Sequence, residues 1–212
     1  TAFVIRPRAI TIKANDAQKV YDGTAWTESG YGIVTGEGAG TLAAGDAVVD
    51  VRVSGSQTAV GESANIPSQA VIKNGDEDRT SNYDITYVNG KLTVTARGGE
   101  DIFTISNVND RVYDGNEYKP VPTVTAQVDG STVVLKQNVD YTIVYEKISG
   151  SDDFKEAGEY KLTITGIVNY EGSTGSASFE IEKRTVTITA GSASKVYDGT
   201  ALRTESYSIT GG

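Results

Sequence analysis

Apolar and polar residues alternate along most of this chain. Residues 10–13 read Ile-Thr-Ile-Lys, which gives one apolar and one polar face when the segment is extended. A period of two residues is typical of a half-buried β-strand. The same alternation predicts further strands at residues 31–33, 49–54, 83–88, 91–94, 141–145, 160–164 and 178–182. A helical turn is expected only at residues 41–46.

Two of these alternating stretches contain a turn dipeptide. Asn89-Gly90 separates the runs at 83–88 and 91–94, and Asp129-Gly130 lies in the middle of residues 124–135. Both dipeptides favour the two-residue turn of a β-hairpin, because their residues accept a positive φ. The sequence therefore predicts a hairpin around each of them.

A seven-residue motif returns along the chain. Lys-Val-Tyr-Asp-Gly-Thr-Ala occupies residues 19–25, recurs unchanged at residues 195–201, and appears in altered form at residues 111–116. The spacing of the copies is that of small domains rather than of solenoid repeats. The motif residues to follow in the structure are Tyr21, Asp22, Gly23, Tyr113, Asp114, Gly115, Tyr197, Asp198 and Gly199.

The motif is interpreted as a turn with a core anchor. Aspartate bonds its own backbone two residues on, glycine accepts a positive φ, and tyrosine buries its ring. The functional alternative is an exposed aromatic residue that stacks on a sugar. The position five residues after each tyrosine holds Trp26, then Tyr118, then Leu202. A leucine cannot serve as a stacking platform, so this position is interpreted as apolar packing.

The two ends of the chain also repeat each other. Residues 3–33 align without a gap with residues 179–209, and about half of the positions are identical. The expected organisation is the last strand of a preceding module at 1–7, module A at 8–97, module B at 98–184, and the truncated start of a third module of type A at 185–212. If this last segment is ordered, it is expected to pack on module B or to take strands from another molecule.

The expected fold is all-β, with each module a β-sandwich of immunoglobulin-like type in an elongated array. Strands at spacings of roughly 8 to 12 residues favour this arrangement. The alternative is a two-layer α+β module with one short helix near Leu42.

Composition excludes two families of chemistry. The chain has no cysteine, no histidine and no methionine. Without histidine there is no Ser-His-Asp triad and no imidazole ligand, and without cysteine there is no thiolate nucleophile, thiolate metal site or disulfide. The formal net charge of −9 argues against nucleic acid as a partner, since phosphate binding requires a basic surface. No apolar run is long enough to insert into a membrane.

Three weaker candidates concern carboxylates and lysines. The acidic clusters at residues 74–78 and 151–153 offer oxygen ligands to calcium, but neither fits the EF-hand loop, so both are interpreted as solvated turns. No carboxylate pair stands in an evident pocket motif. An internal isopeptide bond would need a desolvated lysine, whereas Lys13, Lys19 and Lys91 lie on the polar faces of their segments. The expected catalytic residues, metal sites and cofactors are therefore none.

These repeats resemble a known group of sequences. The resemblance depends on KVYDGTA at 19–25, on residues 42–46, on NYDITYVNGKLTV at 82–94, on VDYTIVY at 139–145, on residues 157–172 and on the FEI at 179–181. Together they resemble the YDG and MBG-type repeats and the bacterial immunoglobulin-like modules of large bacterial surface proteins. Module B departs from the motif at Asn116 and Glu117.

The resemblance implies a cell-surface or secreted bacterial protein, adhesin-like and built from tandem β modules. The resemblance implies no catalytic residue, because the shared positions look structural. The expected function is a structural stalk that holds a distal domain away from the cell. The alternative is an adhesive module that binds a host glycan or an extracellular matrix protein through loops or a sheet edge. A fragment of a carbohydrate-active enzyme is a remote third candidate.

Overall fold

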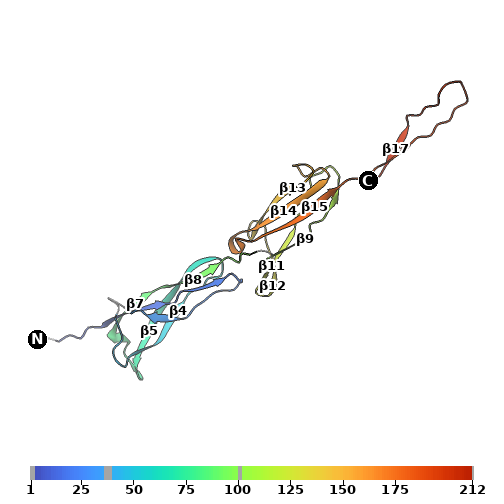
Figure 1. Cartoon of the computed structure of the whole chain (residues 1–212). Helices are drawn as coiled ribbons and strands as arrows, with labels where there is room; N and C mark the ends of the chain where they lie inside the picture. Colours follow the sequence, from blue (N-terminus) through green and yellow to red (C-terminus); the bar gives the residue numbers. More distant parts are fainter. Residues whose placement is uncertain (1–2, 36–39, 100–101, 212) are drawn as a thin grey trace. The chain divides into compact units, whose positions relative to one another are not determined.

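The computed structural model describes residues 3–35, 40–99 and 102–211. The described chain is built from strands, β1 to β17, with two short 3-10 turns at Thr80–Asn82 and Val168–Tyr170 (Figure 1). The all-β class is confirmed. The α+β alternative is wrong, because the residues around Leu42 form no helix: Asp46 donates its backbone N–H to the Ala43 oxygen at 3.1 Å across a turn in which Gly45 has a φ of 85°.

The chain divides into two compact units. The first contains Thr1–Phe103, Thr125–Thr142 and Thr165–Thr174, and the second contains Thr104–Val124, Ile143–Ile164 and Gly175–Gly212. The expected module boundaries at 97/98 and 184/185 stay predictions. Glu100 and Asp101, which lie close to the expected start of module B, are outside the described residues.

The first unit contains two sheets between residues 8 and 95. One sheet has the order β3-β1-β7, from β1 (Arg8–Ala14), β3 (Tyr31–Ile33) and β7 (Tyr83–Val88). The other has the order β2-β8-β5-β4, from β2 (Ala17–Val20), β4 (Ala47–Ser54), β5 (Gly61–Asn74) and β8 (Gly90–Thr95), with β6 (Glu77–Asp78) beside β5. β1 pairs with β7 and β2 with β8 in parallel, whereas β5 pairs with β4 and β8 antiparallel.

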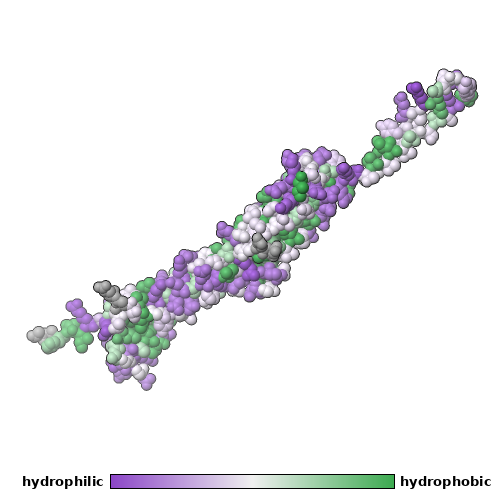
Figure 2. Space-filling view, viewed as in Figure 1, coloured by the Kyte–Doolittle hydropathy of each residue, from purple (hydrophilic) through white to green (hydrophobic). Residues whose placement is uncertain are grey.

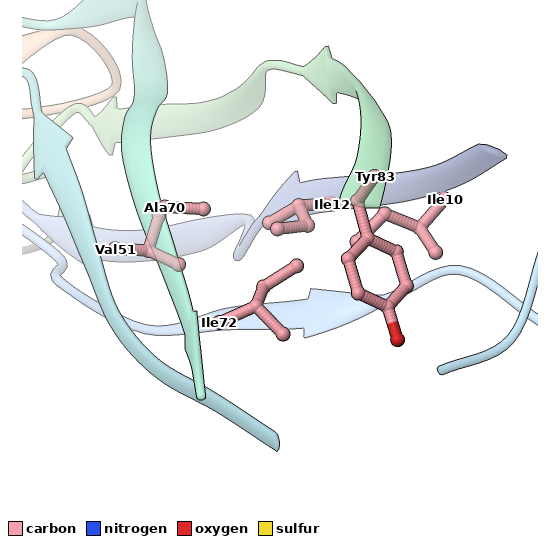
Figure 3. Packing of buried hydrophobic residues seen from close by; sticks show 6 residues of the cluster. All are labelled: Ile10, Ile12, Val51, Ala70, Ile72 and Tyr83. Carbon is pink, nitrogen blue, oxygen red and sulfur yellow. The ribbon is translucent and has the colours of Figure 1, made fainter. Parts of the chain in front are cut away.

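Apolar side chains from both sheets meet in one core. Ile10 and Ile12 of β1, Ile72 of β5 and the ring of Tyr83 on β7 lie together in this core, and in the view of Figure 3 the ring lies between Ile72 and Ile10. The side chains of Val51 and Ala70 complete it from β4 and β5. The two sheets therefore form a sandwich, and the predicted strand at residues 10–13 is confirmed with its isoleucines inward.

The β4 strand departs from simple alternation. Its pairing with β5 shifts register between Val48 and Asp50 and again before Arg52. A β-bulge adds a residue to one strand and changes the face on which the following side chains lie. Val48 and Val51 therefore pack inward, whereas Val49, predicted to share a face with Val51, is 52% exposed. The strand was predicted correctly and the face of Val49 was not.

The predicted hairpin at Asn89-Gly90 is wrong. β7 and β8 belong to different sheets, so the chain crosses from one layer of the sandwich to the other at this dipeptide. Neither residue has a positive φ. A Cβ atom on Gly90 would lie 2.2 Å from the Asn15 oxygen and 2.5 Å from the Ala14 oxygen. Glycine is needed here for a close approach of backbones, not for a turn of type I′.

The second half of the chain forms two more sheets. Their orders are β12-β11-β9 and β10-β15-β14-β13. The strands are β9 (Phe103–Ser106), β10 (Arg111–Val112), β11 (Thr123–Val128), β12 (Ser131–Val134), β13 (Tyr141–Lys147), β14 (Gly158–Gly166) and β15 (Thr174–Glu182). The hairpin at Asp129-Gly130 is confirmed: Val128 pairs with Ser131, and the two turn residues have φ of 48° and 73°.

The core of the second unit is aromatic. The rings of Tyr160 and Phe179 stack with their centroids 5.5 Å apart, and the ring of Phe154 lies 5.1 Å from that of Tyr160. Tyr118 meets Phe179 edge to face at 5.6 Å. Such pairs add to the free energy of area burial, so these contacts dominate the packing of this unit.

The last two strands, β16 (Thr187–Ala190) and β17 (Tyr207–Thr210), form an antiparallel ribbon. Ile188 pairs with Ile209, as Ile12 pairs with Ile33 between β1 and β3. The repeat found in the sequence is therefore also a repeat of strand register. Every residue of the two strands is exposed, and Figure 2 shows hydrophobic side chains at the surface of this last segment. The expected packing of this segment, on module B or with strands of another molecule, stays a prediction.

Candidate functional site

The repeated motif is the candidate site, and its first copy is a closed hydrogen-bonded turn. β2 ends at Val20, and the Lys19 side chain reaches forward over the turn that follows. Its Nζ donates to Asp22 Oδ1 at 2.6 Å, and to Thr24 Oγ1 and the Thr24 backbone oxygen at 2.8 Å each. Asp22 Oδ1 also accepts the Thr24 backbone N–H at 2.9 Å. The ammonium group is thus fully engaged within its own motif.

Electrostatics keep Asp22 ionised. The hydrogen bond from Lys19, reinforced by the backbone and hydroxyl of Thr24, lowers the pKa of the Asp22 carboxyl to about 2. Gly23 between them has a φ of 79°, a conformation in which a Cβ is strained. The aspartate and the glycine are therefore required by the turn itself.

The third copy repeats this geometry without a surrounding core. Lys195 Nζ donates to Asp198 Oδ1 at 2.7 Å and also bonds Thr200 Oγ1, while the Thr200 N–H donates to Asp198 Oδ1 at 3.0 Å. Gly199 has a φ of 77°. The hydrogen bond from Lys195 again lowers the pKa of the aspartate, here Asp198. The turn is thus specified by the motif alone.

The second copy keeps the turn although its sequence is altered. The Asn116 backbone N–H donates to Asp114 Oδ1 at 2.9 Å, and Gly115 has a φ of 79°. Arg111 takes the place of the lysine and forms an ion pair with Asp114. The hydrogen bond from the Asn116 backbone is the main cause that lowers the pKa of Asp114. A basic residue three positions before the aspartate is the shared requirement.

The same basic residue also covers an aromatic ring. Lys19 Nζ lies 5.7 Å from the centre of the Trp26 ring, and the Arg111 guanidinium lies 5.3 Å from the centre of the Tyr118 ring. Both are cation–π contacts between residues seven positions apart. The third copy has Leu202 at this position and no ring. The spacing of seven residues is a signal for this pairing in the sequence, which the interpretation of the position as apolar packing does not use.

The three motif tyrosines have three different surroundings. Tyr21 meets Tyr170 edge to face, with ring centroids 5.8 Å apart. Tyr113 packs against the aromatic core of the second unit. Tyr197 is 92% exposed. The expected packing of the motif tyrosine is therefore found in the first two copies, whereas in the third copy the tyrosine is exposed.

The segment that covers Tyr21 is the loop around the second 3-10 turn. Asn169 accepts the Val60 backbone N–H on its side-chain oxygen at 3.0 Å, and the Arg97 N–H on its backbone oxygen at 2.8 Å. The Ser173 hydroxyl donates to the Arg97 oxygen at 3.2 Å. These bonds hold Tyr170 against Tyr21 inside the first unit.

In residues 3–35, 40–99 and 102–211, no group of three or more histidine, cysteine, aspartate or glutamate residues could hold a metal ion. The three lysines considered for an isopeptide bond each pair with a carboxylate, Lys13 with Asp16 at 2.9 Å, Lys19 with Asp22 at 2.6 Å and Lys91 with Glu62 at 2.9 Å. None of the helical turns in this part of the chain has the length and apolarity needed to span a bilayer.

The comparisons with known proteins give no match for this chain, either among protein-family models or among curated proteins.

The first testable consequence concerns the acid side of the Asp22 titration. Because the folded pKa is depressed to about 2, the ionised carboxylate contributes stability above its ordinary pKa of 3.8, and that contribution is lost as the pH falls from about 4 to 2. Lys19→Met should therefore raise the pKa of Asp22 towards 3.8, measured by NMR titration of its side-chain carbon. Lys91→Met, which removes the partner of Glu62 instead, should leave it unchanged. An equal pKa of Asp22 in wild type and in Lys19→Met would show that Lys19 is not the cause of the lowered pKa.

A second consequence concerns the alkaline side. Burial raises the pKa of Tyr170 to about 12, whereas an unfolded tyrosine titrates near 10. The neutral phenol thus contributes stability below pH 10 that is lost as the pH rises towards 12, at most about 3 kcal/mol for a two-unit shift. Tyr170→Phe should lose this pH dependence. The measurement is the free energy of urea unfolding at pH 9 and pH 11, and an equal fall in both proteins would contradict the prediction.

Proposed function

We propose that this chain is a non-enzymatic structural repeat of a bacterial surface protein of adhesin-like type. Its modules act as a stalk, in tandem immunoglobulin-like β-sandwiches, that holds a distal domain away from the cell. Its place is extracellular or on the bacterial cell surface, and its partners are the neighbouring modules of the same chain.

The observation that carries this proposal is the repetition of one ribbon and one turn. β1 and β3 pair in the register of β16 and β17, and the Asp-Gly turn lies in the segment that joins the two strands of each pair. In all three copies the aspartate side chain accepts the backbone N–H two residues on. A binding site needs free polar groups, whereas the motif aspartates are already hydrogen-bonded within the turn. Repetition adds reach with each copy, which is useful to a stalk and rarely useful to a catalyst.

The test is a reach measurement on a cell surface. One copy or two copies of the chain are inserted between a membrane anchor and a fluorescent reporter, and the reporter's height is measured by super-resolution microscopy. The height should rise in proportion to copy number. Gly/Ser-rich linkers of the same lengths are the control, because the span of a random coil grows only with the square root of its length. Heights equal to those of the linkers would refute the stalk.

A binding array separates the adhesive alternative from the stalk. The immobilised chain is probed with host glycans and extracellular matrix proteins, and the stalk predicts no saturable binding. Saturable binding that a loop substitution removes would assign the chain to the adhesive class instead.

A further inference from the structure

Asparagine is followed by glycine at two places in this chain, Asn74-Gly75 and Asn89-Gly90. In such a pair the backbone nitrogen of the glycine can attack the side-chain amide carbon of the asparagine, because glycine has no Cβ to obstruct the approach. The attack needs an asparagine that is open to solvent and a glycine nitrogen that is free to move. The structure separates the two pairs on these grounds.

Asn74-Gly75 lies at the tip of the β5–β6 hairpin. Asn74 pairs with Glu77, so Gly75 and Asp76 form the turn between the two strands. Gly75 has a φ of 58°, and a Cβ built on it would meet nothing within 4 Å. Residues 74–76 are all exposed. The attacking nitrogen of this pair therefore lies in an open turn rather than in a strand.

Asn89-Gly90 is held in place on its glycine side. Gly90 is buried, begins β8 and pairs with Asn65 of β5. Its Cα lies so near the backbone of β1 that a Cβ would approach the Asn15 and Ala14 oxygens to 2.2 and 2.5 Å. Closing a ring onto Asn89 would draw the Gly90 nitrogen out of this arrangement, so the strand must open first. Local opening costs free energy that the turn at residues 75–76 does not require.

The Asn74 side chain also braces a turn of the first unit. Its Nδ2 donates to Asp46 Oδ1 at 2.9 Å. Asp46 Oδ2 accepts the Tyr83 hydroxyl at 2.6 Å, and the same hydroxyl oxygen accepts the Ala43 N–H at 2.8 Å. The Tyr83 ring belongs to the core cluster that contains Ile72. The Asn74 amide is thus the outer end of a chain of hydrogen bonds that reaches the core.

We infer that Asn74 is a site of spontaneous deamidation, and that the change removes the hydrogen bond from Asn74 to Asp46. The Gly75 nitrogen bonds to Asn74 Cγ, the Cγ–Nδ2 bond breaks, and ammonia leaves with the proton that the Gly75 nitrogen gives up. Water then opens the resulting ring at either carbonyl, which gives aspartate or isoaspartate. Both products replace the amide donor with a carboxylate, which repels the carboxylate of Asp46.

The experiment is peptide mapping by mass spectrometry of the full chain after ageing in mildly alkaline buffer. The Asn74 side chain should convert to a carboxylate at least about tenfold faster than that of Asn89, because only the second reaction requires the strand to open. Asn74→Gln should stay unmodified at this position, since attack on glutamine requires a larger ring. Asn89→Gln is the matched control, and its Asn74 should react as in wild type. In urea, where the chain is unfolded, Asn74 and Asn89 should react at similar rates.

Asn74→Asp reproduces the aspartate product and tests the consequence. Hydrogen bonds from Tyr83 and from Asn74 lower the pKa of Asp46 in the unmodified chain. Asn74→Asp should therefore raise the pKa of Asp46, measured by NMR titration, whereas Asn89→Asp adds the same charge elsewhere and should leave it unchanged.

Four outcomes would overturn the inference. In the folded chain these are an Asn74 that remains an amide and an Asn89 that reacts as fast as Asn74. A tenfold difference that persists in urea would show that neighbouring residues, and not the fold, select the site. An equal pKa of Asp46 in wild type and in Asn74→Asp would show that the change does not reach the brace.

Discussion

Phe179→Ala is expected to lower the free energy of unfolding of the second unit by about 3–5 kcal/mol. Phe179 is 2% exposed, its ring stacks on Tyr160 at 5.5 Å, and the rings of Tyr118 and Tyr145 meet it edge to face at 5.6 and 6.4 Å. The substitution leaves a cavity among rings that come from separate segments of the chain, which cannot collapse together. Urea unfolding followed by tyrosine fluorescence measures the loss.

The chain supplies its own control for this substitution. Phe3 aligns with Phe179 in the repeat, yet it is 96% exposed. Phe3→Ala should change the free energy of unfolding by no more than about 0.5 kcal/mol. Similar losses in the two variants would mean that the aromatic core is not centred on Phe179.

The fold was predictable where local chemistry decides it. The alternation at residues 10–13 and the Asp129-Gly130 turn each depend on residues adjacent in sequence, and both are confirmed. The predicted face of the Val49 side chain is wrong because the bulge in β4 depends on the partner strand β5, which lies more than ten residues away. Periodicity describes a strand in isolation and carries no signal of such a register shift.

The candidate site was predictable in its turn and not in its contacts. The aspartate and glycine of the motif have local roles, and the three copies form the same turn. The cation over the ring does not follow from hydrophobic patterning, because that pattern treats Trp26 and Tyr118 only as apolar side chains. The partner of Tyr21 could not be predicted, since Tyr170 lies far along the chain and only folding brings it near.

A substitution at Asn89 distinguishes a hairpin turn at Asn89-Gly90 from a crossing between the two sheets. A hairpin needs a positive φ at both residues, so Asn89→Ala would then cost about 1–2 kcal/mol. In the crossing between sheets, Asn89 has no positive φ, and Asn89→Ala should change the free energy of unfolding by no more than about 0.5 kcal/mol.

Gly90→Ala is expected to lower the free energy of unfolding of the first unit by about 3 kcal/mol. The new methyl group would lie 2.2 Å from the Asn15 oxygen and 2.5 Å from the Ala14 oxygen. Both are backbone atoms at the end of β1, so relief requires β1 and β8 to move apart. Gly32→Ala is the matched control: its Cβ meets nothing within 4 Å and its φ is not positive, so stability should stay equal or rise by up to about 1 kcal/mol. The measurement is the free energy of urea unfolding of the two variants. A Gly90→Ala protein as stable as Gly32→Ala would refute the close approach of β8 to β1.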